Sequence, residues 1–375
     1  LPPGLLSLDV EDVEASLEAQ DIPFELLPRS LTSLQLVSSE FNLTEEHISN
    51  LPPALTTLET YAEPLDASLV ALLPRGLTTL GSQMAFALTP EYLPVLPPTI
   101  TTLAITSDSL DQVLPPCLTS LSISKSSTLP RILPPWPKNL TALELSYMEL
   151  CELPTFPKDL VILTFFDVSM TKESFPHLPE SLKQLEDWSM NNFSDSSLFA
   201  LFPRALTSIS FPNRKQPLEL PSASSHMLPR SLTLLELGRS STTSSGWFSG
   251  LPSTLNSLSI TLERLYDEDI HDLGRACPGL LTLKLTSWPQ SEQAFHDTFS
   301  RALRHLPASL THVSLLEPSD AGFSLEVEDL ASLPTQLQEC RIDCNTDIDH
   351  WSRPPLPNTL RMLCIGHERL PWSRK

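Results

Sequence analysis

The chain has 375 residues, with 45 acidic against 24 basic side chains and a formal net charge of −21 at pH 7. This charge argues against a nucleic-acid partner, which requires a basic surface, and against binding to an anionic membrane. Proline is abundant and glycine scarce, at 37 and 10 residues, and no apolar run reaches the length of a membrane span. We therefore expect no nucleic-acid binding and no membrane insertion.

A ten-residue phrase of the form Leu-Pro-x-x-Leu-Thr-x-Leu-x-Leu recurs along the whole sequence, and we call its first residue n. The sixteen copies start, in chain order, at Leu1, Leu27, Leu51, Leu73, Leu96, Leu114, Trp136, Phe156, Leu178, Phe202, Leu228, Leu251, Ala276, Leu306, Leu333 and Leu356. The fifteen steps between them cover 355 residues, a mean period of about 23.7 residues. A period in this range, with this leucine spacing, is typical of a solenoid.

The phrase predicts a corner followed by a short strand. Positions n+7 and n+9 are nearly always apolar, as at Leu34 and Leu36, and such alternation indicates a strand with one buried face. The proline at n+1 has no N–H for a ladder, so it belongs at the entry to the strand. One such unit cannot bury its apolar side alone, but stacked units share a core and a parallel sheet.

The connectors between phrases are of several kinds. We expect helices over residues 11–20, 66–72, 194–201, 266–276, 291–306 and 326–333. Short Pro/Ser-rich connectors such as residues 124–131 suit extended or turn structure, and residues 213–226 and 239–249 are predicted to be loose polar loops. The connectors are expected on the convex side of the array.

The segment Leu118-Thr119-Ser120-Leu121-Ser122-Ile123 matches LxxLxL, so the chain resembles the leucine-rich repeat family over essentially all of its length. The proline-led phrase is similar to two branches, the FNIP-type repeats and the repeat domain of bacterial secreted ubiquitin-ligase effectors. The FNIP-type pair occurs once, as Phe41-Asn42. The resemblance implies an α/β solenoid: a horseshoe of about 16 repeats with one parallel concave sheet. Its convex side would mix short helices, 3-10 turns and extended segments.

We predict a single domain over residues 1–375. The chain opens inside a repeat and has no starting methionine, so we expect a fragment of a longer array or protein. Most copies lack the asparagine that related families place after the strand. Serine or threonine hydroxyls after the strands, as at Ser38, Ser107 and Ser126, are expected to replace it.

The six cysteines match no disulfide framework. Cys340 lies at n+7 and Cys364 at n+8 of adjacent copies, so they should face opposite sides of the sheet and stay unbridged. Free thiols fit a reducing compartment, which predicts a cytoplasmic protein. A secreted or surface location stays open as an alternative.

Positions n+6, n+8 and n+10 should form the exposed concave face, which is rich in serine, threonine and acidic residues. The candidate partner-binding residues are Glu59, Tyr61, Glu144, Phe166, Glu186, Trp188, Glu236, Lys284 and Arg341. Phe166 and Trp188 share position n+10 in neighbouring copies and suggest a binding hot spot. However, Asp187 at n+9 is a poor core residue. A one-residue bulge would turn Asp187 outward and Trp188 inward, and both alternatives remain open.

The sequence contains no nucleophile elbow, P-loop or His-Glu-x-x-His motif. We predict no enzyme activity, no cofactor and no metal, and we interpret the acidic run 267–272 as a solvated helix face. The predicted function is a monomeric, non-catalytic protein-interaction scaffold whose concave face binds a protein partner, with a basic partner favoured. One alternative is the substrate-recognition domain of a ubiquitin ligase or other enzyme whose catalytic part lies elsewhere. A second is an extracellular or surface receptor-type array.

Overall fold

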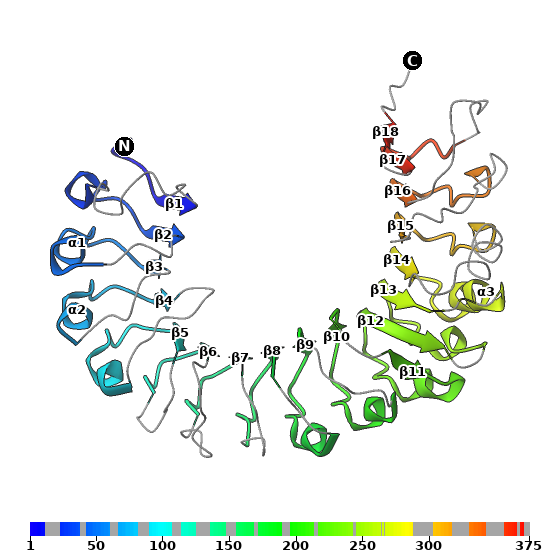
Figure 1. Cartoon of the computed structure of the whole chain (residues 1–375), viewed down its shortest axis with the longest axis horizontal. Helices are drawn as coiled ribbons and strands as arrows, with labels where there is room; N and C mark the ends of the chain where they lie inside the picture. The colour runs from blue at the N-terminus through cyan, green and yellow to red at the C-terminus, as the bar shows by residue number, and fades with distance from the viewer. Residues whose placement is uncertain are drawn as a thin grey trace. The chain divides into compact units, whose positions relative to one another are not determined.

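Each of the sixteen phrases leads into a β-strand that begins at position n+6 in the computed structural model (Figure 1). The model falls into two compact units, Leu1–Leu182 and Lys183–Lys375. It describes residues 1–11, 23–37, 43–60, 67–81, 90–106, 114–124, 136–147, 155–168, 172–189, 196–213, 217–242, 245–263, 265, 267–287, 303–316, 330–342, 356–365 and 368–370. The prediction of one domain over residues 1–375 is not tested by this division and stays a prediction.

The first unit is a ladder of parallel strands, each paired with the next along the chain. Its strands are β1 (Ser7–Glu11), β2 (Ser33–Val37), β3 (Thr57–Thr60), β4 (Thr79–Gly81), β5 (Thr102–Thr106), β6 (Ser120–Ser124), β7 (Ala142–Ser146) and β8 (Ile162–Phe166). Equivalent positions of successive phrases pair directly, as Leu34 does with Leu58. The period of the phrase therefore sets the register.

The second unit has a parallel ladder of the same kind. Its strands are β9 (Gln184–Asp187), β10 (Ser208–Phe211), β11 (Leu218–Leu220), β12 (Leu234–Thr242), β13 (Ser257–Leu262), β14 (Thr282–Ser287), β15 (His312–Leu316), β16 (Glu339–Ile342), β17 (Met362–Ile365) and β18 (Glu368–Leu370). β18 departs from the prediction because it pairs antiparallel with β17. Only two residues separate these strands, and a parallel pair requires a much longer crossover.

The corner before each strand is closed by one backbone hydrogen bond. In every copy the n+4 N–H donates to the n+1 carbonyl, at N–O distances of 3.0–3.2 Å. Proline suits the acceptor position because only its carbonyl is required there. The leucines at n, n+4, n+7 and n+9 then fill the core, and Leu27, Leu31, Leu34 and Leu36 are all buried. The predicted α/β solenoid, with strands that bury one face, is confirmed.

Two rows of side-chain hydroxyls tie most corners to the corner before them. At n+3 the hydroxyl donates to the n+2 or n+4 carbonyl of the preceding copy, as Ser231 Oγ does to Arg204 O at 2.8 Å and Leu206 O at 2.6 Å. At n+5 the hydroxyl donates to the preceding n+5 carbonyl, as Thr56 Oγ1 does to Thr32 O at 3.0 Å. We call these two rows the hydroxyl ladders. The n+3 members are Ser30, Thr99, Ser181, Ser231, Thr254, Ser309 and Thr359. The n+5 members are Thr32, Thr56, Thr78, Thr101, Thr119, Thr141, Thr207, Thr233 and Thr311.

Hydroxyl groups therefore satisfy backbone groups at the turns, but from a different place than expected. The predicted substitutes Ser38, Ser107 and Ser126 lie outside the described residues. The ladders lie before each strand, where a short side chain on one corner reaches the carbonyls of the preceding corner. The carbonyl of Thr32 shows how dense this bonding is, because it also accepts the N–H groups of Thr56 at 2.8 Å and Thr57 at 3.0 Å.

The connectors lie on the side of each sheet opposite the open strand face (Figure 1). They contain α1 (Glu45–Ser49), α2 (Ala67–Leu72), α3 (Asp267–Ala276), η2 (Phe24–Leu26), η3 (Pro90–Val95), η4 (Lys172–His177), η5 (Ser196–Leu201), η6 (Ser222–Met227) and η7 (Phe248–Gly250). α2 and α3 confirm two predicted helices, whereas the predicted helix at residues 194–201 is a 3-10 helix. The predicted helix at 11–20 lies outside the described residues except for Glu11, which is the last residue of β1. The predicted helix at 291–306 is described only from Leu303, and the one at 326–333 only from Leu330. Residues 125–131 also lie outside the described residues.

The described residues of the two connectors predicted to be loose loops form regular structure, so the prediction is wrong for those residues. The first contains β11, whose Leu218 and Leu220 are buried, and η6. The second connector begins with the C-terminal half of β12, which pairs with β11. This half follows a shift in the register between β12 and β13 at Leu237 and Arg239. Gly238 lies at this shift. A Cβ there would meet the backbone carbonyl of Pro212, so the close approach of these two segments of backbone requires glycine.

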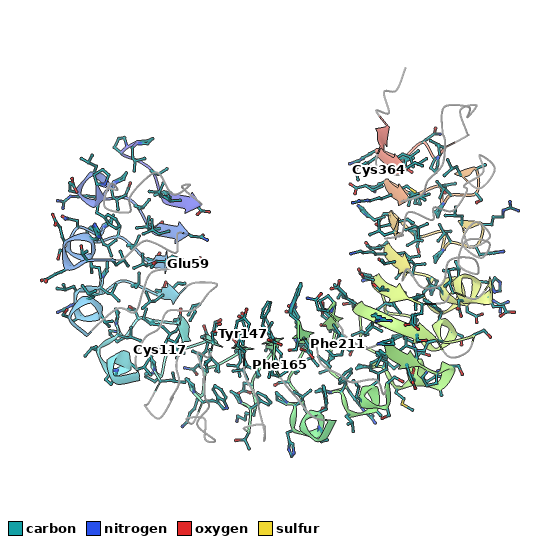
Figure 2. All side chains as sticks on the ribbon, in the orientation of Figure 1. Glu59, Cys117, Tyr147, Phe165, Phe211 and Cys364 are labelled. Atoms are coloured by element: carbon teal, nitrogen blue, oxygen red, sulfur yellow. The ribbon has the colours of Figure 1, made fainter. Side chains whose placement is uncertain are left out.

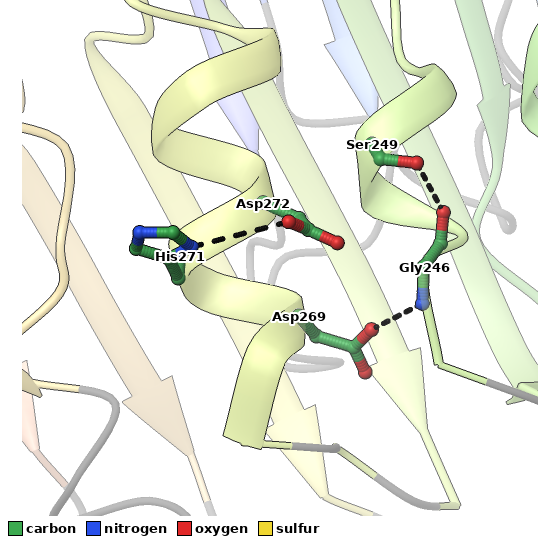
Figure 3. Close-up of polar contacts among 5 residues, drawn as sticks. All are labelled: Gly246, Ser249, Asp269, His271 and Asp272. Carbon is green, nitrogen blue, oxygen red and sulfur yellow. Dashed lines mark hydrogen bonds and ion pairs between the residues drawn. The ribbon is translucent and has the colours of Figure 1, made fainter.

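The acidic run 267–272 is not simply a solvated helix face. Asp269 on α3 is fully buried, and its Oδ1 accepts the Gly246 N–H at 3.2 Å (Figure 3). Gly246 has φ +91°, a left-handed conformation that glycine adopts without a steric penalty. Trp247 next to it is buried, and its Nε1 donates to Ser224 Oγ at 3.0 Å. The solvated-face interpretation is therefore wrong for Asp269, which anchors one connector to the next.

Candidate interaction surface

The strand face is the side of each sheet formed by positions n+6, n+8 and n+10, turned away from the connectors. In the first unit Figure 2 shows Glu59 and Tyr147 at this face, while Phe165 points toward the core. Phe165 at n+9 is fully buried, and Phe166 at n+10 is 40% exposed. The alternation expected from the sequence therefore holds on β8.

Phe166 forms an exposed aromatic pair with Tyr147, which is 50% exposed. Their ring centroids lie 5.5 Å apart with an interplanar angle of 65°, an edge-to-face arrangement that aromatic rings prefer. The Tyr147 N–H donates to Phe166 O at 2.7 Å, so the backbone holds the same two residues together. On β7, Ser146 Oγ donates to Glu144 Oε1 at 3.3 Å, and Ser146 is in register with Phe166. These contacts place a carboxylate at Ser146, which precedes Tyr147 in the chain and lies opposite Phe166 across the strands.

A change in backbone conformation brings Tyr147 to this face. Tyr147 is at n+11, where strict alternation would point it into the core. Its φ is +56°, and Asp167, the n+11 residue of the next copy, has φ +50°. The left-handed region costs a non-glycine residue about 1–2 kcal/mol. The alternation shifts by one residue here, since Asp167 is exposed and Val168 after it is fully buried.

The second unit carries a cluster of acidic and aromatic side chains at its own strand face. Ser210 on β10 is in register with Glu186 on β9 and with Glu236 on β12. Its hydroxyl bonds to Glu236 Oε2 at 2.6 Å. Trp188 is 39% exposed, and its Nε1 donates to Glu186 Oε2 at 3.4 Å. An indole, two carboxylates and a hydroxyl thus lie together on three adjacent strands.

Asp187 decides between the two alternatives for Trp188. The Asp187 side chain is at the inward position with only 5% exposure, and its Oδ1 accepts the Ser189 N–H at 2.9 Å. The bulge alternative would have turned it outward. Trp188 therefore faces the surface. The cost of burying the carboxylate is offset by hydrogen bonding of this kind.

Charges in the n+8 row of the second unit fall on every second strand, with a serine between each pair. The row from β9 to β16 reads Glu186, Ser210, Glu236, Ser259, Lys284, Ser314 and Arg341. Successive charges are two strand spacings apart, or about 9.6 Å. The row is therefore acidic at its β9 end and basic at its β16 end.

No family model matches the sequence, and no curated protein matches it. Among solved structures it is similar to CroV588, described as a circular leucine-rich repeat protein, at 21% identity and a TM-score of 0.47. That match covers 98% of this chain and 54% of CroV588, so the chain spans about half the length of that protein. The leucine-rich repeat-containing protein LegL7 from Legionella pneumophila shares 14% identity over 79% of this chain and 97% of its own, with a TM-score of 0.36. YopM from Yersinia enterocolitica shares 16% identity over 96% of this chain and 91% of its own, with a TM-score of 0.30.

The assignment of the fold rests on the repeated corners and strands of this chain and not on these similarities. Proline-led corners, parallel strands in register and buried leucines at fixed positions recur in both units. The chain has the leucine-rich repeat fold.

Within this leucine-rich repeat array, eight of the nine predicted partner-binding residues lie on described strand faces or directly after the strands. Glu59, Glu144 and Phe166 belong to the first unit, and Tyr61 lies outside the described residues. Phe166 and Trp188 belong to different units, so their proposed pairing stays a prediction. Tyr147 was missed because the period-2 pattern assigns n+11 to the core. A large aromatic residue directly after a strand was the available signal.

The described residues offer little other chemistry. In the described part of the chain, no group of three or more His, Cys, Asp or Glu side chains is placed to hold a metal ion. No helix there is long and apolar enough to cross a bilayer. Cys340 is a buried free thiol and Cys364 a half-exposed one, which confirms that they face differently and stay unbridged. Burial raises the pKa of Cys340 to about 12, with a further contribution from Cys364, and burial raises the pKa of Cys277 to about 11.

Proposed function

We propose that this leucine-rich repeat array is a non-catalytic scaffold that binds a protein partner on its strand face. The observation that carries the proposal is the exposure of Tyr147, Phe166 and Trp188 on faces whose other members are mostly small or polar. The core needs none of these rings, and buried aromatic anchors dominate the energetics of protein interfaces. Trp188 is the strongest single anchor because it stands beside two carboxylates.

The charge pattern of the second unit further defines the proposed partner. Glu186 and Glu236 favour positive charge over β9 to β12, and Lys284 and Arg341 favour negative charge over β14 to β16. A partner surface with the opposite order of charges satisfies all four groups at once. The net charge of −21 speeds association with a basic partner at low salt.

Three further features belong to the proposal. The proline-led phrase and the Phe41-Asn42 pair support an FNIP-like variant of the repeat. We propose one repeat domain over residues 1–375 that acts as a monomer. The free thiols of Cys117, Cys277, Cys340 and Cys364 support a reducing, cytoplasmic setting.

Comparative capture from a cell extract, read by quantitative mass spectrometry, tests the strand face. Trp188→Ser is compared with Met227→Ser, which removes an exposed apolar side chain from the outer layer of the same unit. Glu236→Lys is compared with Glu268→Lys on α3. We expect each strand-face variant to lose the proteins that the parent chain enriches, because losing a hot-spot residue weakens binding roughly 30-fold or more.

The proposal is wrong if the outer-layer variants lose the same proteins to the same degree. It is also wrong if Trp188→Ser and Glu236→Lys both retain them. Circular-dichroism melting of all four variants separates loss of binding from loss of folding.

A further inference from the structure

We propose that Tyr147, Phe166 and Glu144 form a subsite in the first unit that binds the guanidinium group of an arginine presented by a protein partner. The inference deepens the proposed function and rests on it, because it assigns one chemical group of the partner to one place on the strand face. None of the three residues is required by the core or by the hydroxyl ladders.

The aromatic pair has the geometry of a cation-binding corner. The rings of Tyr147 and Phe166 meet at 65° with centroids 5.5 Å apart, so they are not stacked face to face. Half of Tyr147 and two-fifths of Phe166 remain exposed. An aromatic face attracts a cation within about 6 Å of its centroid, and arginine is the commoner protein cation at such sites. The flat guanidinium group also stacks on aromatic faces.

Glu144 supplies the negative charge. Its carboxylate accepts the Ser146 hydroxyl through Oε1 at 3.3 Å, and Ser146 lies opposite Phe166 and directly before Tyr147. A carboxylate accepts paired hydrogen bonds from a guanidinium group. Strands β6, β7 and β8 contain no lysine or arginine, so no basic group on these strands neutralises Glu144.

The subsite is held in place before a partner arrives. Tyr147 has φ +56°, which turns its ring to the strand face, and its N–H bonds to Phe166 O at 2.7 Å. Backbone conformations of this kind persist where the surroundings enforce them, and they concentrate at functional sites. A ring pair fixed in advance loses little side-chain freedom when it binds a cation.

Fluorine NMR of the full chain labelled with 3-fluorotyrosine tests the subsite. The chain has four tyrosines, and a Tyr147→Phe variant identifies the Tyr147 signal. The probe is a short capped glycine–serine peptide with one central arginine, and its control is the same peptide with citrulline, which has the same shape and no charge. We expect the arginine peptide to shift the Tyr147 signal saturably and the citrulline peptide to leave it unchanged.

The carboxylate is tested by Glu144→Gln against Glu46→Gln, which removes the same charge from α1 in the outer layer of the same unit. We expect Glu144→Gln to weaken arginine binding about two- to fivefold and Glu46→Gln to leave it unchanged. Equal shifts from the two peptides, absence of a shift, or equal effects of the two variants would overturn the subsite. If the subsite fails while Trp188→Ser still loses the captured proteins, the proposed function stands without it.

Discussion

Changing Thr254 to valine removes one member of the n+3 hydroxyl ladder while keeping the shape of the side chain. Thr254 Oγ1 donates to Arg230 O at 2.9 Å and to Leu232 O at 2.7 Å. One hydroxyl has one proton, so the two contacts share a single hydrogen bond. The net contribution of such a bond is about 1 kcal/mol, and loss of the donor at the part-buried contact to Leu232 O extends the loss toward about 2 kcal/mol.

Native-state hydrogen exchange measures this loss where it occurs. A repeat array opens locally, so the free energy of opening β12 and β13 is more informative than a single global midpoint. We expect Thr254→Val to lower that free energy by about 1–2 kcal/mol. The matched control is Thr261→Val, the same chemical change on the strand face of β13, which should cost less than about 0.5 kcal/mol.

The ladder argument is refuted if Thr254→Val leaves the exchange of β12 and β13 unchanged, or if Thr261→Val has an equal effect. Refutation would mean that the hydroxyls accompany the corners without stabilising them. The backbone hydrogen bonds between successive copies would then be sufficient to fix the register of the strands.

Gly238→Ala should destabilise the second unit by about 1–3 kcal/mol in urea unfolding, because the new methyl group meets a backbone carbonyl that cannot move alone. Gly279→Ala is the control, since a Cβ there meets nothing within 4 Å, and equal losses would contradict the reasoning. With a thiol reagent at pH 8, exposed Cys117 should react in the folded chain while Cys277 and Cys340 react only after unfolding. The pKa values of these two buried thiols are raised, so ionisation of the thiols should leave the free energy of unfolding unchanged below about pH 9. Above that pH it should lower the free energy of unfolding, because the thiols ionise first in the unfolded chain. A pH scan of unfolding that stays flat to pH 11, or falls equally in a Cys277→Ala/Cys340→Ala double variant, would contradict this.

The strands were predictable because a single local signal determines them. Proline at n+1 removes a donor at the strand entry, and apolar residues at n+7 and n+9 specify which face is buried. The apolar signal survives in weak copies such as the one at Ala276, where Cys277 replaces the proline and its carbonyl still closes the corner. The strand that begins at Thr282 follows at the same offset.

The hydroxyl ladders were not predictable from one copy, because they depend on how two copies stack. A threonine at n+5 reads as an ordinary exposed strand residue until the preceding n+5 carbonyl lies beside it. Repetition at the same position was the available signal. Ser38 and Ser107 share the offset n+11, whereas Ser126 lies at n+12, and all three lie outside the described residues.

Tyr147 and Asp187 show two opposite ways in which the sequence pattern fails to predict whether side chains alternate between the core and the strand face. At Tyr147 the alternation changes because the backbone enters the left-handed region, which no side chain in the sequence announces. At Asp187 the alternation holds despite an unsuitable residue, because the carboxylate finds a hydrogen bond in the core. Residue type alone predicts neither outcome.

Different positions of the phrase have different structural tasks, and this bears on the interpretation of the strand face. The residues at n+1, n+3 and n+5 hold the corners together, and those at n, n+4, n+7 and n+9 fill the core. Apart from places such as Gly238, where a neighbouring backbone approaches closely, the side chains at n+6, n+8 and n+10 take part in neither task. Tryptophan and phenylalanine are costly choices for such positions, since each leaves apolar surface in water. Their presence at Trp188 and Phe166 is therefore the basis on which we propose that the strand face contacts a partner.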